Sequence, residues 1–281
     1  METTDKELTL SSPGVMDKYQ SAGKIAQQVM AELIEKCQPG ADIHDLCVWG
    51  NKRINEECAK CFFNKKMDKG VAFPVSIAPN DICGNFSPIK EESFTLNAGD
   101  LVKIDLGVHI DSFPVMLAHT FIIGVTTDEL KLKTASAAFL ALQSAVKQLI
   151  PGKNNGDATK IISEVSALYN VQPLEGVLSH EIKRYVIDGN TVIINKETID
   201  QKVDNHDFKV NDIFAIDVII TGNETEGKSK ESELRTTIFK RNLDANYDLK
   251  TKNGRQLLSE IKNKFADFCF TLNDFEDELV F

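Results

Sequence analysis

Residues 99–105 read GDLVKID, and residues 211–217 read NDIFAID. Each stretch runs from an acidic residue through an apolar segment to a final aspartate, Asp105 in the first and Asp217 in the second. These two aspartates lie 112 residues apart. Because self-similarity at a fixed offset is typical of a repeated structural unit, the two motifs indicate an internal duplication.

The same offset of 112 residues separates two Pro-Gly pairs, at residues 39–40 and 151–152. Each pair follows a stretch with apolar residues every three or four positions, at 17–36 and at 129–149, which predicts two helices. Pro-Gly is a helix stop signal, so both helices are expected to end at these pairs. Two unrelated motifs with one offset strengthen the duplication.

The same order of elements is expected in both halves. A second helix follows each stop, at about 42–60 and at 157–168. Strand-like segments come next, with β-branched and aromatic residues between turn residues. They are LVKIDLGVHI at 101–110, MLAHTFIIGV at 116–125, IFAIDVIIT at 213–221 and LRTTIFK at 234–240.

The fold class that follows is α/β (α+β), with two pseudo-symmetric halves at about 17–127 and 128–281, after a flexible N-terminus at 1–16. Residues 17–123 are expected to superpose on 129–239, with Asp105 and Asp217 facing each other across a central cleft. MLAHTFIIGV has no counterpart in the second half by residue 281. The last strands are therefore expected to be missing, which leaves an open sheet edge in a fragment or a shortened variant, or an edge covered by another element.

Composition excludes several function classes. The 42 acidic and 32 basic residues give a net charge of -10, which argues against a nucleic-acid-binding surface over the whole chain. No secretory signal or membrane-spanning segment is expected. The six cysteines indicate free thiols in a reducing compartment. Cys58 and Cys61 form a CxxC without a second ligand pair, so we interpret them as ordinary thiols rather than a zinc or redox site.

A run of segments in order carries a family resemblance: GVAFPVSIAPND at 70–81, GDLVKIDLGVHIDSF at 99–113, EGVLSHEIKRYVIDG at 175–189, FAIDVIITGNETEGK at 214–228 and FTLNDFEDE at 270–278. With them the chain resembles the proliferation-associated proteins, which are non-enzymatic members of the methionine aminopeptidase and prolidase superfamily. The resemblance implies the pita-bread fold, in which two α/β halves pack curved antiparallel sheets and outer helices around a central cleft.

Enzymes of this superfamily hold two metal ions with two aspartates, a histidine and two glutamates, and the metals activate a water molecule. By resemblance, four of these positions fall on Asp105, Met116, His180 and Asp217. The last glutamate would follow residue 281. Met116 carries no charge and its thioether is a poor ligand for hard divalent ions, while aspartate at 217 is one methylene shorter than glutamate.

Two histidines of the enzymes' substrate pocket fall on Asn85 and Asp188. The resemblance therefore implies an inactive homologue with no catalytic residues, no bound metal and no cofactor. The alternative is a methionine-type metalloaminopeptidase with altered ligands. A third hypothesis is an adaptor that holds a peptide or protein in the vestigial cleft.

The resemblance further implies binding to the large ribosomal subunit near the peptide exit tunnel and to rRNA or other RNA, with roles in ribosome biogenesis, translation regulation and growth. It implies localisation in the cytoplasm and the nucleus or nucleolus, and no membrane partner. An insert at about 222–264 is the candidate RNA-binding segment. Its basic residues are Lys228, Lys230, Lys240, Arg241, Lys250, Lys252, Arg255, Lys262 and Lys264. Interspersed acidic residues leave a solvated helix face as the other interpretation.

Overall fold

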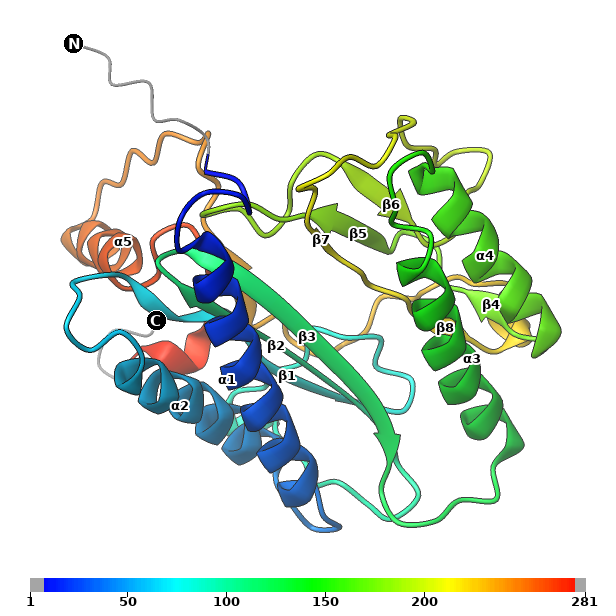
Figure 1. Ribbon diagram of the computed structural model, residues 1–281. Helices are drawn as coiled ribbons and strands as arrows, with labels where there is room; N and C mark the ends of the chain where they lie inside the picture. The colour runs from blue at the N-terminus through cyan, green and yellow to red at the C-terminus, as the bar shows by residue number, and fades with distance from the viewer. Residues whose placement is uncertain (1–7, 276–281) are drawn as a thin grey trace. The chain divides into compact units, whose positions relative to one another are not determined.

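The structure is a computed structural model that describes residues 8–275 (Figure 1). Its contacts divide the chain into two compact units. One unit, which we call the sheet unit, contains Ser21–Gly124 and the chain from Ser232 onward. The other, which we call the helical-hairpin unit, contains the chain up to Gln20 and Val125–Glu231. No helix within residues 8–275 combines the length and apolar character that a membrane span needs.

The sheet unit is built on three long antiparallel strands in the order β1-β2-β3, with bounds Lys69–Pro79, Leu101–Ile110 and Phe113–Ile122. Helices α1 (Val15–Lys36) and α2 (Ile43–Lys60) cover one face. Alternate residues of β2 from Val102 to Ile110 are fully buried in the core with those helices. Because side chains alternate across a strand, Asp105 and Gly107 lie on the opposite face of the sheet.

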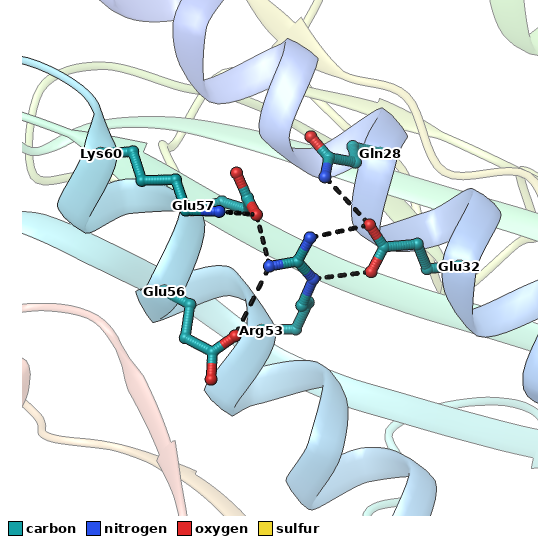
Figure 2. Close-up of polar contacts among 6 residues, drawn as sticks. All are labelled: Gln28, Glu32, Arg53, Glu56, Glu57 and Lys60. Carbon is teal, nitrogen blue, oxygen red and sulfur yellow. Dashed lines mark hydrogen bonds and ion pairs between the residues drawn. The ribbon is translucent and has the colours of Figure 1, made fainter.

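Arg53 joins the two helices of this unit on their outer surface (Figure 2). Its guanidinium binds both carboxylate oxygens of Glu32 on α1, at 2.7 and 3.0 Å. The same group contacts Glu56 and Glu57 of α2, and Lys60 also binds Glu57. Hydrogen bonds from Arg53 and Gln28 hold the pKa of Glu32 at about 2, so this carboxylate stays ionised well into the acid range.

The helical-hairpin unit consists of α3 (Glu129–Val146), α4 (Asn155–Leu168) and short strands. Alanines of α3 at 137, 141 and 145 are buried, and the last two pack in one core with residues of α4 such as Ile162. The strands form two small sheets. The first is β4-β8 (Gln172–Pro173 and Ile220–Thr221), and the second is β6-β5-β7 (Val192–Ile194, Leu178–Glu181 and Phe214–Ala215). A 3₁₀ turn, η2, follows at Asn223–Thr225.

The four predicted helices are confirmed, and the offset of 112 extends to individual hydrogen bonds. Asp42 caps α2 by accepting from the backbone of Asp45, and Asn154 caps α4 by accepting from the backbone of Asp157. Isolated bridges repeat in the same way, as do the backbone bonds that precede each second helix. They are Asp42↔Thr95 with Asn154↔Asp207, and Ile43 N to Phe94 O with Asn155 N to His206 O. The duplication therefore survives as a shared local architecture.

The Pro-Gly stops also match in conformation. Gly40 and Gly152 adopt φ of 87° and 93°, in the left-handed region that glycine enters without strain. α1 nevertheless begins at Val15, inside the stretch predicted to be flexible at 1–16. Residues 1–7 and the last three residues of FTLNDFEDE lie outside the described part of the chain.

The strand predictions were right in the first half and partly wrong in the second. β2 matches its prediction, and β3 starts three residues earlier because its turn at 111–112 is tight. The predicted strand at 213–221 is interrupted at 216–219. β2 has a long partner on each side, whereas 213–221 pairs with β5 at one end and with β4 at the other.

LRTTIFK contributes only β9 (Ile238–Lys240), which pairs with β10 (Cys269–Thr271) inside the sheet unit. The segment after residue 232 thus joins the sheet unit, although the sequence placed it in the second half. The segment at 222–264 is not one inserted loop, because it contains β9 and most of α5 (Lys252–Phe265). Short 3₁₀ turns η1 (Lys90–Glu92) and η3 (Leu272–Asp274) complete the unit.

Candidate functional site

Asp105 lies at the middle of β2, directly opposite Ser76 of β1 and Ala118 of β3. It is half-buried on the sheet face that the helices leave uncovered. β1 is irregular here, with register shifts on either side of Phe73. The Ser76 hydroxyl accepts a hydrogen bond from the Phe86 backbone at 2.8 Å, which fixes the loop after β1 to the strand.

Met116 lies on β3 opposite Gly107 of β2, two residues along the ladder from the pair that contains Asp105. A β-carbon at residue 107 would come within 2.7 Å of the Met116 sulfur. The sulfur therefore occupies the space over the glycine backbone, on the same face as Asp105. The position that resemblance assigns to a second carboxylate is filled by a packed thioether.

Asn85 belongs to the same unit, in the loop between β1 and η1. It is exposed, and its φ of 55° is left-handed, a conformation that asparagine tolerates better than most residues. Asp188 belongs to the helical-hairpin unit, where it is half-buried in the loop between β5 and β6. The structure thus places both predicted pocket positions on loops.

Ser179 is the residue that sequence reasoning missed in the helical-hairpin unit. It is buried on β5, and its hydroxyl accepts a hydrogen bond from the Asp217 backbone N–H at 2.9 Å and lies 3.3 Å from the Asp217 carbonyl. These bonds hold residue 217 in the irregular stretch between β7 and β8. The sequence signal was weak, because a serine inside LSHE has no feature that marks it as a backbone clamp.

His180 lies next to Ser179 on β5, and its Nδ1 contacts the Gly189 carbonyl at 3.1 Å. A carbonyl only accepts, so Nδ1 carries the proton and Nε2 of the neutral ring presents a lone pair. This is the arrangement of histidines that ligate metals. Burial among the surrounding atoms raises the pKa of Asp217 to about 6, while the nearby His180 acts to lower it.

The donor set does not fit a pair of hard divalent ions. The sheet unit offers one carboxylate, Asp105, beside a thioether, and the helical-hairpin unit offers His180 with Asp217. Within either unit, no three His, Cys, Asp or Glu side chains of the described residues gather closely enough to hold a metal. Two metals need several bridging carboxylates to offset their mutual repulsion, and a thioether supplies no charge.

The basic residues differ in how available they are. Lys228, Lys230, Lys250 and Lys252 are exposed, and so is Lys262. The remaining basic residues have local partners or are half-buried. Arg241 binds Asp267 and the Ala266 carbonyl, Lys264 binds Glu260 and the Asp274 carbonyl, Arg255 donates to the carbonyls of Leu249 and Lys250, and Lys240 is half-buried.

α5 itself is amphipathic, with a polar outer side and no fully buried residue. Phe265 at its end joins an aromatic cluster with Phe270 and Phe275, at ring distances of 5.3 to 5.9 Å. The lysines before and along the helix therefore sit on an element that aromatic packing anchors at its C-terminal end.

Comparisons with known proteins agree with the architecture. Residues 17–237 match the family model of metallopeptidase family M24. The chain is 40% identical over 275 residues to proliferation-associated protein A of Dictyostelium discoideum, covering 96% of this chain and 71% of that protein. It is 36% identical over 276 residues to a Schizosaccharomyces pombe protein named curved DNA-binding protein, covering 95% and 71%.

The fold is similar to a solved structure of a thermophilic Arx1, with a TM-score of 0.84 and 25% identity over 95% of this chain and 78% of that one. Structures of methionine aminopeptidases and prolidases share the fold at lower identity. The pita-bread fold predicted from the sequence is confirmed by these likenesses.

Proposed function

The chain belongs to metallopeptidase family M24 and, within it, to the proliferation-associated proteins, and from this premise we propose that it is a non-catalytic protein that binds the large ribosomal subunit through rRNA. The observation that carries the first part is Met116. Its sulfur packs over Gly107 where the enzymes of this fold place a second aspartate. A metal-bound water needs that charge, so peptide hydrolysis lacks its activating centre.

The binding part of the proposal rests on the exposed lysines. Lys250 and Lys252 lie immediately before and at the start of α5, and Lys262 lies near its end. Clustered exposed lysines suit phosphate contacts. The acidic remainder of the chain is expected to be repelled by RNA and to face outward. Growth-related roles in ribosome biogenesis and translation, in the cytoplasm and nucleus or nucleolus, follow as part of the same proposal.

A single experiment separates this function from its competitors. The purified chain is sedimented with large ribosomal subunits over a salt titration, beside a variant with Lys250, Lys252 and Lys262 changed to Gln. Arg255 is left unchanged, because its guanidinium holds the carbonyls that precede α5. The variant is expected to bind more weakly, with a salt slope smaller by about one unit for each phosphate that it no longer neutralises.

The matched control changes Lys160, Lys202 and Lys209 to Gln, which removes the same charge from exposed positions of the other unit. Its salt slope is expected to equal that of the unmodified chain. Equally weakened binding in both triple variants, or unchanged binding in both, counts against an RNA contact at α5 and favours the adaptor that holds a peptide.

The metallopeptidase alternative has one observation in its favour, since His180 keeps the tautomer of a metal ligand. Elemental analysis and turnover of a Met-peptide with added Mn²⁺ or Co²⁺ test it. We expect no stoichiometric pair of metals and no turnover. Two metals per chain together with hydrolysis would establish the enzyme instead.

A further inference from the structure

The outer face of α3 is apolar along its whole length. Its exposed side chains include Leu132, Phe139 and Val146, which are seven residues apart, and the stripe continues to Ile150 just beyond the helix. Phe139 at the centre is 64% exposed. Ser136, Gln143 and Ile150 form a second row at the same spacing, so the two rows have the spacing of a coiled-coil contact. We call these six residues the α3 stripe.

The internal duplication provides a direct comparison within the same molecule. The stripe positions Leu132, Ser136 and Phe139 correspond to Gln20, Lys24 and Gln27 of α1, which are polar. Inward positions differ in the opposite sense. Ile25, Val29 and Leu33 of α1 are buried, and their equivalents in α3 are the buried alanines 137, 141 and 145.

α3 therefore has small residues facing inward and large apolar residues facing outward, the reverse of α1. It carries five exposed large apolar side chains, Leu130, Leu132, Phe139, Leu140 and Val146, whereas no other described helix carries more than one. Scattered exposed apolar residues are normal, but an ordered row on one helix face is typical of an interaction site.

The charges at the two ends of the helix point to its occupant. Asp128 and Glu129 lie at the N-terminal end, and Lys147 lies just past the C-terminal end. A second α3 laid antiparallel would bring each acidic end to the other copy's Lys147 and would oppose the two helix dipoles. Ser136 and Gln143, at mirrored distances from Phe139 or close to it, would then face each other across the axis.

We propose that the α3 stripe is a self-association surface, through which two copies of this chain pair with their α3 helices antiparallel and Phe139 near the twofold axis. The contact involves one helix from each copy, so it lies at the small end of specific interfaces. The dimer is therefore weak and depends on concentration. Its polar residues at Ser136 and Gln143 select the register at a cost in affinity.

Sedimentation equilibrium of the full chain, from low micromolar concentration upward, tests the proposal. The average mass is expected to rise toward that of a dimer as concentration increases. Phe139→Lys is expected to remain a monomer. A second variant, Leu132→Gln with Phe139→Gln, copies the residues of α1 and is expected to do the same. Leu168→Lys, at an apolar residue of α4 that is 81% exposed and off the stripe, should associate like the unmodified chain.

Charge exchange tests the antiparallel arrangement separately. Glu129→Lys and Lys147→Glu should each weaken the dimer several-fold, and the double variant should recover affinity. Circular dichroism confirms that each variant is folded. A chain that stays monomeric at every concentration overturns the proposal, and so does a folded Phe139 variant that associates as strongly as the unmodified protein. Failure of the double exchange to recover affinity excludes the antiparallel pairing.

Discussion

Met116 and Gly107 face each other across the β2–β3 ladder, and the methionine sulfur takes the volume that any side chain at residue 107 would need. The backbone of Phe73 on β1 closes the other side, because a β-carbon at 107 would lie 2.7 Å from the Phe73 nitrogen. Glycine at 107 is thus required by close packing from two neighbouring strands.

Gly107→Ala is expected to destabilise the protein by about 1–3 kcal/mol, as overpacking does when backbone atoms cannot move away. Adding Met116→Ala should recover only part of this stability, since the Phe73 backbone stays in place. Chemical denaturation measures both variants. Gly23→Ala is the control, because it lies on α1 with no atom within 4 Å of an added β-carbon, and it should be neutral or slightly stabilising. Equal behaviour of the two single alanine variants would contradict the packing at 107.

His109 of β2 should make stability depend on pH. The ring is 8% exposed, stacks on Phe268 at 4.4 Å, and has a buried Nδ1 without a hydrogen-bond partner in the described structure. Burial lowers the pKa of His109 to about 4, against the opposing influence of Asp68 and Asp111. The unfolded chain therefore binds this proton first as the pH falls.

The sign follows from linkage. Above about pH 6.5 both states hold neutral His109 and the group has no effect, whereas between 6.5 and 4 stability falls by up to roughly 3 kcal/mol. Denaturation at a series of pH values measures the slope, and His109→Phe should remove this part of it. His119→Gln, at an exposed histidine of β3, is the control and should leave the slope unchanged. An unchanged slope in His109→Phe would assign the acid sensitivity to other groups.

Helices and the duplication were predictable because local signals specify them. The Pro-Gly stops, the caps at Asp42 and Asn154 and the helical spacing all lie within a few residues of the structure they determine. The strand at 213–221 was not predictable as two pieces, since a strand's length depends on which partners lie beside it. LRTTIFK has strand-forming residues, but its partner β10 lies further along the chain, beyond α5.

The candidate site shows the same limit. Asp105 and His180 were identified from motifs, and their half-buried positions agree with that identification. Ser179 was missed because its function is a contact with residue 217, 38 residues away. The basic residues at 222–264 looked alike in the sequence, and only local partners distinguish Arg241, with its ion pair to Asp267, from the exposed Lys262.

Arg53 is expected to stabilise the packing of α1 on α2. Arg53→Met should cost about 1 kcal/mol, because it removes a bidentate pair and leaves three carboxylates close together. The effect should shrink at high salt, and it should fade as the pH falls from about 4.5 toward 2, where Glu32 takes up its proton. Thermal melting at two salt concentrations measures it. Lys90→Met, at a more exposed ion pair, should change stability by less than about 0.5 kcal/mol.

Met116→Asp tests whether residue 116 faces the vestigial metal pocket. The new carboxylate would lie on the same sheet face as Asp105, two residues along the ladder, so two acidic groups would converge on one cation. Without metal, their repulsion should lower the melting temperature. Added Mn²⁺ should raise it relative to a chelator, because an ion that binds only the folded state stabilises that state.

Met116→Leu keeps the size of the side chain and supplies no charge, so its melting temperature should not respond to Mn²⁺. Turnover of a Met-peptide should stay absent in both variants, since one restored aspartate leaves the donor set short of the carboxylates that two metals need. A Met116→Asp variant that ignores Mn²⁺ would mean that residues 105 and 116 do not share a site. Hydrolysis by that variant would mean that one substitution silenced an otherwise intact enzyme, which contradicts the non-catalytic function proposed for this chain.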